Sequence, residues 1–335
     1  MVKFASILAL AAALALAGCG GEQAESQPGP PPTPGPAPKV DRPVELGGSP
    51  SAVVAGLGSV WVADNLRGQV LRVDPVSGQV ERVSVNPAPI AIAVGEDAVW
   101  VASAGGAVLR VDARTLATTP ASTQVPGAAG IAVGEGSAWV TSASAGTVTR
   151  FDEATARQLG DPIAVGPQPT DIAVGAGAVW VASSAQMSGT VTRIDAETGE
   201  AGEPIEAAEG QIFALTYGED GVWVAGSDAL RGDLIDIVRI DPDSSEVEGA
   251  FVRLERPGLP VRLAAGEGFV WVAQSGGDPL EADSPGTVVR IDPEERRLVG
   301  GAAEVGRGPT GVSVGEGGVW VATGGDGAVV RVQGE

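Results

Sequence analysis

The chain lacks histidine, and it contains one cysteine and two lysines among its 335 residues. Histidine is the usual general base near neutral pH and a frequent metal ligand, so its absence argues against the commonest acid–base catalysis and against haem or zinc sites. A lone cysteine excludes a disulfide within the chain. The formal net charge of −21 repels phosphate backbones, and we therefore predict no binding to nucleic acid.

The only cysteine closes an N-terminal segment typical of a targeting peptide. Lys3 precedes an apolar run over 4–17, which is too short for an ordinary membrane span. The tetrapeptide Leu16-Ala17-Gly18-Cys19 looks like a bacterial lipobox, in which Cys19 becomes the lipidated first residue of the mature protein. The alternative is an ordinary secretory peptide in which Cys19 is incidental. We predict a lipoprotein signal peptide over 1–19 and an extracytoplasmic protein, lipid-anchored to a bacterial cell membrane.

A proline- and glycine-rich segment follows over 20–40. It has almost no apolar residues and cannot bury a core, so we expect a disordered tether that lifts the folded part away from the membrane. The remaining residues, 41–335, are expected to form one folded domain.

Tryptophan marks a repeat that runs through the rest of the chain. Every tryptophan is followed by valine, and successive tryptophans are 39 to 49 residues apart. That period is typical of propeller blades built from four short strands. The seven residues are Trp61, Trp100, Trp139, Trp180, Trp223, Trp271 and Trp320.

The fourth repeat shows the expected strands most clearly. Apolar and β-branched residues occupy 169–174, 178–182 and 190–194, and a short fourth strand begins at 204. Glycine, aspartate and proline separate these runs, and no segment after the tether has a helical period. We therefore predict an all-β domain.

The two ends of the repeat region predict how the ring closes. The last repeat stops at Val332 without a fourth strand, whereas the segment 43–47 precedes the first strand of the first repeat. This segment resembles 162–166, the fourth strand of the third repeat. We predict a seven-bladed β-propeller of four-stranded antiparallel blades, in which the N-terminal strand completes the last blade and leaves no free edge.

Arginine and aspartate recur in the third strand as regularly as tryptophan does in the second. In the shortest hairpins, tryptophan and arginine are ten or eleven residues apart, which can place them side by side on antiparallel neighbours. We predict a buried tryptophan–arginine packing motif in all seven blades; the alternative is an exposed aromatic ladder that binds sugar. The aspartates, two residues after the arginines, are predicted to form turns. The arginines are Arg72, Arg110, Arg150, Arg193, Arg239, Arg290 and Arg331, and the aspartates are Asp74, Asp112, Asp152, Asp195, Asp241 and Asp292.

Two sets of loops define opposite rims of the predicted ring. Connections from first to second strand and from third to fourth strand are short and uniform, and we name their side the turn rim. Connections from second to third strand and from blade to blade vary, and we name their side the loop rim. Variable loops on a rigid scaffold commonly carry function, so we place any ligand site on the loop rim around the channel. The candidates are Asn65, Asp171, Asp228, Asp278 and Asp326, each with the alternative of being a solvated loop residue.

The acidic residues near the sixth repeat fit no metal-binding pattern. The spacing of Asp278, Glu281 and Asp283 matches no calcium loop. We predict no cofactor, with calcium or magnesium as the alternative wherever carboxylates cluster.

The repeat resembles a known group of propellers. Its pattern Ile-Ala-Val-Gly-x-Gly-x-Val-Trp-Val-Ala, followed by Gly-x-Val-x-Arg-Ile-Asp-Pro-x-Thr-Gly, is clearest over 130–152, 172–199 and 311–331. It is similar to the repeats of streptogramin (virginiamycin B) lyases and of YVTN (YncE-like) propellers, which implies a propeller over nearly all of 43–332. The lyases of that group use a histidine base and a magnesium ion. No residue here matches that histidine, so we assign no catalytic residue.

Two functions follow as hypotheses. The sequence favours a non-catalytic binding or scaffold module at the cell surface, a monomer that holds a protein or cell-envelope ligand on its loop rim and reaches the membrane through Cys19. The competing hypothesis is an enzyme, a metal-assisted lyase or hydrolase related to the streptogramin lyases that uses carboxylates in place of histidine. Converging carboxylates around one empty pocket would favour the enzyme, and a flat mixed rim would favour protein binding.

Overall fold

The computed structural model describes residues 35–85, 88–185, 188–227, 234–255, 258–276 and 284–334. The chain divides into two units, Met1–Thr33 and Pro34–Glu335. The predicted signal peptide, Cys19 and most of the predicted tether lie outside the described residues. Within the described ranges, no helix is long and apolar enough to cross a membrane.

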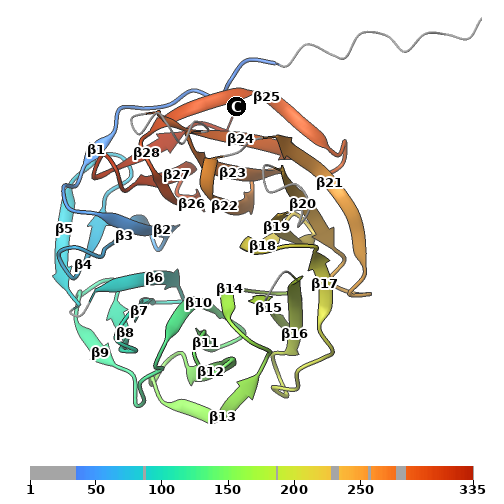
Figure 1. The fold of residues 1–335 in the computed structure, drawn as a ribbon. Coiled ribbons are helices and arrows are strands. Elements are labelled where there is room, and N and C mark those ends of the chain that lie inside the picture. The colour runs from blue at the N-terminus through green and yellow to red at the C-terminus, as the bar shows by residue number, and fades with distance from the viewer. Residues whose placement is uncertain are drawn as a thin grey trace, which may run out of the picture. The chain divides into compact units, whose positions relative to one another are not determined.

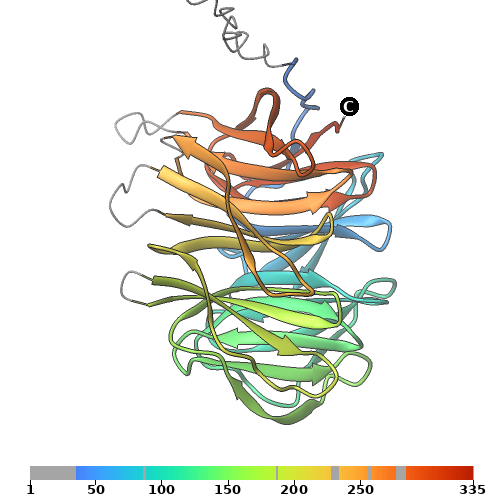
Figure 2. The ribbon, with the colours of Figure 1, turned by 90° about the vertical axis from the view of Figure 1, so that its right-hand side faces the viewer.

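Seven four-stranded antiparallel sheets surround one axis and form a β-propeller (Figure 1). Within each of the first six blades the strands follow one another outward from the channel in chain order. The predicted fold class is therefore confirmed. Figure 2 views the ring from the side, with the two rims at its left and right.

The strands of the seven blades occupy equivalent places. The innermost strands are β2 (Pro50–Gly56), β6 (Pro89–Val94), β10 (Ala128–Gly134), β14 (Pro169–Gly175), β18 (Ile212–Gly218), β22 (Gly258–Gly266) and β26 (Pro309–Gly315). The second strands are β3 (Ser59–Asp64), β7 (Ala98–Ser103), β11 (Ser137–Ser142), β15 (Ala178–Ala185), β19 (Gly221–Ser227), β23 (Phe269–Ser275) and β27 (Gly318–Thr323). The third strands are β4 (Gln69–Val73), β8 (Val108–Asp112), β12 (Thr147–Asp152), β16 (Ser188–Asp195), β20 (Leu234–Ile240), β24 (Gly286–Asp292) and β28 (Ala328–Val332). The outer strands are β5 (Val80–Ser84), β9 (Thr118–Pro120), β13 (Gln158–Ala164), β17 (Ile205–Ala208), β21 (Val247–Glu255), β25 (Arg297–Gly306) and, in blade 7, β1 (Val44–Glu45).

Residues 39–47, which we name the closing segment, complete blade 7. The short strand β1 pairs with β28 in antiparallel register, with Val44 opposite Val329. Beyond β1, the amide of Leu46 donates to the carbonyl of Gly327 at 2.9 Å. The predicted closure is confirmed, and it gives the last blade an outer strand from the other end of the chain.

Tryptophan and arginine pair as predicted. In all seven blades they are direct partners between the second and third strands. Six indoles have no exposed surface and Trp320 is 3% exposed, so the alternative of an exposed sugar-binding ladder is wrong. In four blades the guanidinium stacks on its partner indole, at distances from 4.7 Å for Arg150 to 5.9 Å for Arg331 between its central carbon and the ring centroid.

The stacking part of this motif is not sevenfold. Arg290 lies over the ring of Phe269 at 4.9 Å. Arg239 instead pairs with Glu248 and Arg110 with Asp97, each with 2.5 Å between a guanidinium nitrogen and a carboxylate oxygen. The backbone register fixes which residues are neighbours, while nearby acids and rings decide where each flexible guanidinium rests.

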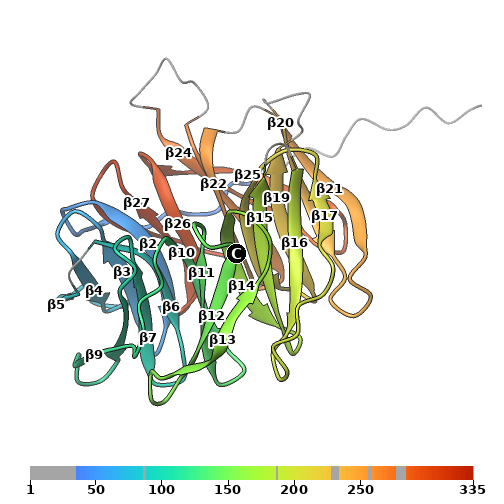
Figure 3. The same ribbon diagram turned by 60° about the horizontal axis from the view of Figure 1, so that its bottom comes forward.

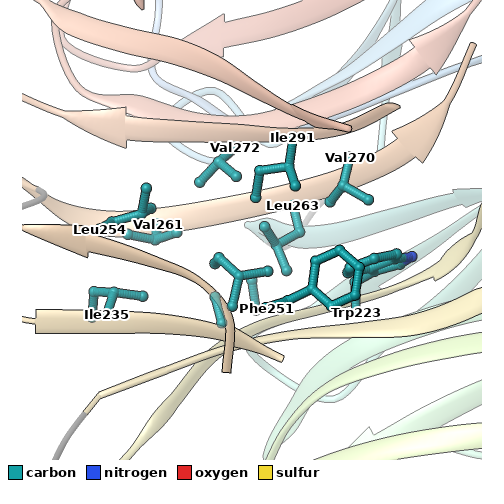
Figure 4. Close-up of a cluster of buried hydrophobic side chains, with 12 residues drawn as sticks. Trp223, Ile235, Phe251, Leu254, Val261, Leu263, Val270, Val272 and Ile291 are labelled. Carbon is teal, nitrogen blue, oxygen red and sulfur yellow. The ribbon is translucent and has the colours of Figure 1, made fainter. Parts of the chain in front are cut away.

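Apolar side chains fill the space between neighbouring blades. Figure 4 shows the cluster that joins blades 5 and 6, where the rings of Trp223 and Phe251 meet edge-on with centroids 4.8 Å apart. Leu263 and Val270 of blade 6 belong to the same cluster. Each sheet is thus covered on both faces by its neighbours, which explains why a large aromatic residue can repeat at mid-blade without exposure.

The turn rim is built from repeated tight turns. In six blades the turn between the first two strands has positive φ at both central residues, as a type I′ turn requires; the pairs are Leu57-Gly58, Glu135-Gly136, Ala176-Gly177, Glu219-Asp220, Glu267-Gly268 and Glu316-Gly317. In blade 2 the amide of Glu96 donates instead to the carboxylate of Glu153, from blade 3, at 2.5 Å. In the six blades with this turn, the indole nitrogen of the repeated tryptophan donates to the carbonyl of a glycine five residues earlier. In blade 2, the indole nitrogen of Trp100 has no hydrogen-bond partner among the described residues.

The repeated aspartates form turns on the same rim. The Oδ1 atom of Asp195 accepts hydrogen bonds from the amide of Thr198 at 2.8 Å and from its hydroxyl at 3.0 Å. These contacts hold the pKa of Asp195 below its ordinary value of 3.8. Equivalent hydrogen bonds lower the pKa of four further aspartates, namely Asp74, Asp112, Asp152 and Asp241. The predicted structural role of these residues is confirmed.

We expect the closing segment to contribute measurably to stability. Leu46 is 3% exposed and packs among Val53, Trp320 and Val329. Leu46→Ala should lower the free energy of unfolding by about 2–4 kcal/mol, because it removes buried methyl groups and leaves a cavity. Val76, which is 93% exposed, supplies the control, and Val76→Ala should change stability by less than about 0.5 kcal/mol. Equal effects of the two variants in urea unfolding would contradict the closure.

The loss of stability in acid should reveal the contribution of the aspartate turns. A carboxylate whose pKa is lowered by folding stabilises the native state above its unfolded pKa, near 3.8, and that contribution is lost as the pH falls through the lower, folded value. Asp195→Asn should therefore reduce the thermal midpoint at about pH 6 and have a much smaller effect at about pH 2. Asp161→Asn, at an exposed position on β13, should have little effect at either pH. A penalty for Asp195→Asn that does not shrink in acid would show that its charge is irrelevant.

Candidate functional site

A pocket of about 540 Å³ occupies the channel on its loop-rim side. Its wall is formed where the innermost strands of all seven blades begin, from β2 through β26. A volume of this size is typical of small-molecule sites. The pocket therefore opens on the loop rim, and a ligand site there stays a prediction.

One position in the innermost strands distinguishes the blades chemically. Each innermost strand enters through a β-bulge, a device that re-aims the side chains beside it. In six blades the residue at this position pairs with the residue two places after the repeated tryptophan. The occupants, in blade order, are Ala52, Ala91, Gly130, Asp171, Ala214, Arg262 and Gly311. Five are small, and the two charged residues carry opposite charges.

Asp171 is fixed to the channel wall by two backbone amides. Its Oδ1 atom accepts from the amide of Ile172 at 2.9 Å, and its Oδ2 atom accepts from the amide of Leu215 on the next blade at 2.9 Å. Burial raises the pKa of Asp171, while these hydrogen bonds and the positive charge of Arg262 act against that rise. The carboxylate of this partly buried residue is thus held in one orientation.

Arg262 is anchored in a complementary way, by carbonyl groups. Its Nε atom donates to the carbonyl of Thr310 on blade 7 at 3.0 Å, and its Nη1 atom donates to the carbonyl of Val261 at 3.0 Å. Within the described part of the chain, Arg262 forms no direct ion pair with Asp171, and no group accepts from its Nη2 atom. The guanidinium therefore keeps donors available to the pocket.

The pocket has a polar side and an apolar side. Alanine, glycine, isoleucine, valine and a single serine from blades 1 to 3 line one side. Most of the hydrogen-bonding side chains come from blades 4 to 6, and these are Gln168, Thr170, Asp171, Ser184, Gln211 and Arg262. Blades 5 and 6 also contribute apolar residues, among them Phe213 and Leu263, so the arrangement can hold a ligand that has both apolar and polar or charged groups.

The predicted candidates have different surroundings. Asp171 lines the channel pocket. Asn65 donates from its amide nitrogen to the carbonyl of Pro89 at 3.3 Å and so joins blades 1 and 2. Asp326 is exposed and accepts from the amide and the Nε atom of Arg307, both at 2.6 Å, which lowers its pKa. Neither residue lines the channel pocket.

Two further candidates, Asp228 and Asp278, lie outside the described residues, and their assignment stays a prediction. Sequence reasoning missed Arg262 together with Gln168 and Gln211. Aligning the first strands of the seven repeats would have found Arg262, since it is the one large cation at a position held mostly by alanine and glycine. In the described ranges, no three acidic, histidine or cysteine residues are grouped so as to hold a metal ion.

Comparison with known proteins shows likeness in structure only. No family model and no curated protein matches the chain. Hydrazine synthase of Kuenenia stuttgartiensis matches with a TM-score of 0.70 at 15% identity, over 85% of this chain and 96% of that one.

Two other solved structures match over similar lengths. Virginiamycin B lyase from Staphylococcus aureus matches with a TM-score of 0.68 at 16% identity, over 88% of this chain and 99% of that one. The WD40 repeats of RRP9 match with a TM-score of 0.69 at 10% identity, over 88% of this chain and 99% of that one. At such identities the likeness establishes the fold, a β-propeller of the kind seen in streptogramin lyases and WD40 proteins.

Proposed function

We propose that this protein is a non-catalytic binding or scaffold module, held at the outside of a bacterial membrane by lipidated Cys19. Its ligand, a protein or a molecule of the cell envelope, binds at the loop rim over the mouth of the channel. The observation that carries this proposal is the channel pocket of about 540 Å³, whose described lining has one acid and one base and lacks the converging carboxylates that would favour the enzyme. Such a pocket is shaped for binding, because its polar groups are few and fixed in direction.

The hairpins of blades 4 to 6 support a ligand site on the loop rim. Blades 1, 2, 3 and 7 join their second and third strands with four residues each, at 65–68, 104–107, 143–146 and 324–327. Blades 5 and 6 use longer connections, 228–233 and 276–285, and in blade 4 the two strands themselves lengthen to eight residues each. In Figure 3 strands β15, β16, β19 and β20 rise toward this rim at the top of the view. The blades that extend the rim are those that supply most of the polar wall of the pocket.

Binding is favoured over catalysis because of how Asp171 is held. The enzyme hypothesis requires a carboxylate in the channel that takes the place of the missing histidine, and the raised pKa of Asp171 is the observation in its favour. Both oxygens of Asp171, however, already accept backbone amides from two blades. A carboxylate tied to two strands in this way orients a ligand better than it shuttles protons.

Binding to the loop rim can be tested by a matched pair of charge insertions. Gln211 is exposed at the pocket, and Gln79 is exposed on the turn rim. Gln211→Arg should abolish capture of the partner from envelope extract by the immobilised full-length protein, whereas Gln79→Arg should retain it. Partner amounts are compared after quantitative elution. Equal capture by both variants, or loss only with Gln79→Arg, would overturn the assignment of the loop rim.

The membrane anchor can be tested separately in a bacterial host. Cys19→Ser should move the protein from the membrane fraction to the soluble extracytoplasmic fraction, because the acyl chains that hold it can no longer be attached. Ser26→Ala, in the predicted tether, should leave the protein in the membrane fraction. Retention of the Cys19→Ser variant in membranes would show that the anchor lies elsewhere.

A further inference from the structure

Two side chains of opposite charge line the channel pocket on blades that are not neighbours. Among the described residues of the pocket, the charged side chains are Asp171 on blade 4 and Arg262 on blade 6. Blade 5, between them, places Ala214 at the equivalent position, and Ile212 and Phe213 of the same blade also line the pocket. The two groups do not neutralise each other directly, and each is fixed by backbone contacts rather than by the other.

Each charged group keeps unused hydrogen-bonding capacity. A carboxylate offers about four acceptor positions, and two amides occupy two of those of Asp171. A guanidinium has five N–H groups, and two carbonyls occupy two of those of Arg262. A ligand cation can therefore bind Asp171 and a ligand anion can bind Arg262 without displacing the contacts that hold the ring together.

We propose that the channel pocket binds a short peptide with both ends free, its ammonium group at Asp171 and its carboxylate at Arg262. This inference rests on the proposed function in so far as it uses the loop rim as the ligand face, and it adds the class of ligand. The ammonium donates hydrogen bonds to the Asp171 carboxylate, and the peptide carboxylate accepts from the guanidinium. Both contacts are charge-assisted hydrogen bonds, which are stronger than neutral ones.

The size and shape of the pocket favour two or three residues. An extended dipeptide spans at most about 7 Å and a tripeptide about 11 Å, so a ligand of this length can join two charged groups that are not in direct contact. The pocket volume of about 540 Å³ accommodates a ligand of that size. On blades 2 and 3, Ile90 and Ala129 form part of an apolar wall that can receive the side chains of the peptide.

The electrostatics of the whole chain add to this selectivity. With a net charge of −21 the protein repels simple anions, so the lone arginine of the pocket favours an anionic group that arrives on a molecule with its own positive charge. Burial disfavours the ionised form of Asp171, and a bound ammonium group removes that penalty. A zwitterion satisfies both groups at once, whereas a singly charged ligand leaves one of them without its counter-ion.

The test compares one dipeptide with two blocked forms of itself on the intact protein. Leucyl-phenylalanine, its N-acetyl derivative and its C-terminal amide are titrated by calorimetry. We expect the free dipeptide to bind and each blocked form to bind about tenfold or more weakly, because each lacks one charged end. Failure of the free dipeptide to bind at about 1 mM, or equal affinity of all three forms, would overturn the proposal.

Variants then assign each end of the ligand to its residue. Asp171→Asn should weaken the free dipeptide about tenfold and leave the N-acetyl form unaffected, whereas Arg262→Gln should weaken the free dipeptide and spare the amide. Asp161→Asn and Arg114→Gln, at exposed positions outside the pocket, are the charge-matched controls. If Asp171→Asn and Arg262→Gln lower the thermal midpoint but leave the dissociation constants unchanged, the two residues are structural and the proposal is wrong.

The outcome for this ligand is separable from that for the partner on the loop rim. Dipeptide binding without any capture from envelope extract would support the peptide site and contradict the proposal of a larger partner on the loop rim. Capture that depends on Gln211, without dipeptide binding, would support a partner on the loop rim and contradict the peptide site.

Discussion

Each blade can cover both faces of its sheet only against its two neighbours, so closure of the ring is the constraint on which the rest of the structure depends. The closing segment satisfies it by adding β1 to β28, and it buries Leu46 against blades 1 and 7. With the ring closed, every mid-blade tryptophan lies between sheets, and the clusters of apolar residues run from blade to blade without an end. An open array of the same repeats would expose one such face at each end.

A closed ring also divides the molecule into a repetitive part and a variable part. The turn rim is fixed by backbone requirements: positive φ in the inner turns and aspartate-bound amides in the outer ones, repeated with little change. The loop rim has no such requirement, and blades 4 to 6 differ there from the other four. The channel pocket shares this asymmetry, because the residue beside the bulge that opens each innermost strand is charged in blades 4 and 6 and small in the other five.

The charged pair in the channel departs from the packing rule that governs the other blades at that position. Alanine and glycine fit this position most easily, because the neighbouring innermost strand lies close to it. A methyl group added at Gly311, for example, would lie 3.0 Å from the amide nitrogen of Val53. Asp171 and Arg262 fit because each uses its polar atoms to bind the backbone of the next blade. Their place at two of seven equivalent positions, with opposite charge, is the observation on which the proposed ligand site rests.

The sequence by itself determined the blade number, the strand order, the ring closure and the burial of tryptophan, because a repeat of fixed spacing imposes the same local pattern seven times. It also pointed to Asp171 and to the loop rim. Only the tertiary structure decided that Asn65 and Asp326 bind other parts of the ring and that Arg262 shares the pocket with Asp171. Residues 171 and 262 are distant in the chain and meet at one channel through the curvature of the ring, which is a property of blade packing and is not encoded in the pattern of any single repeat.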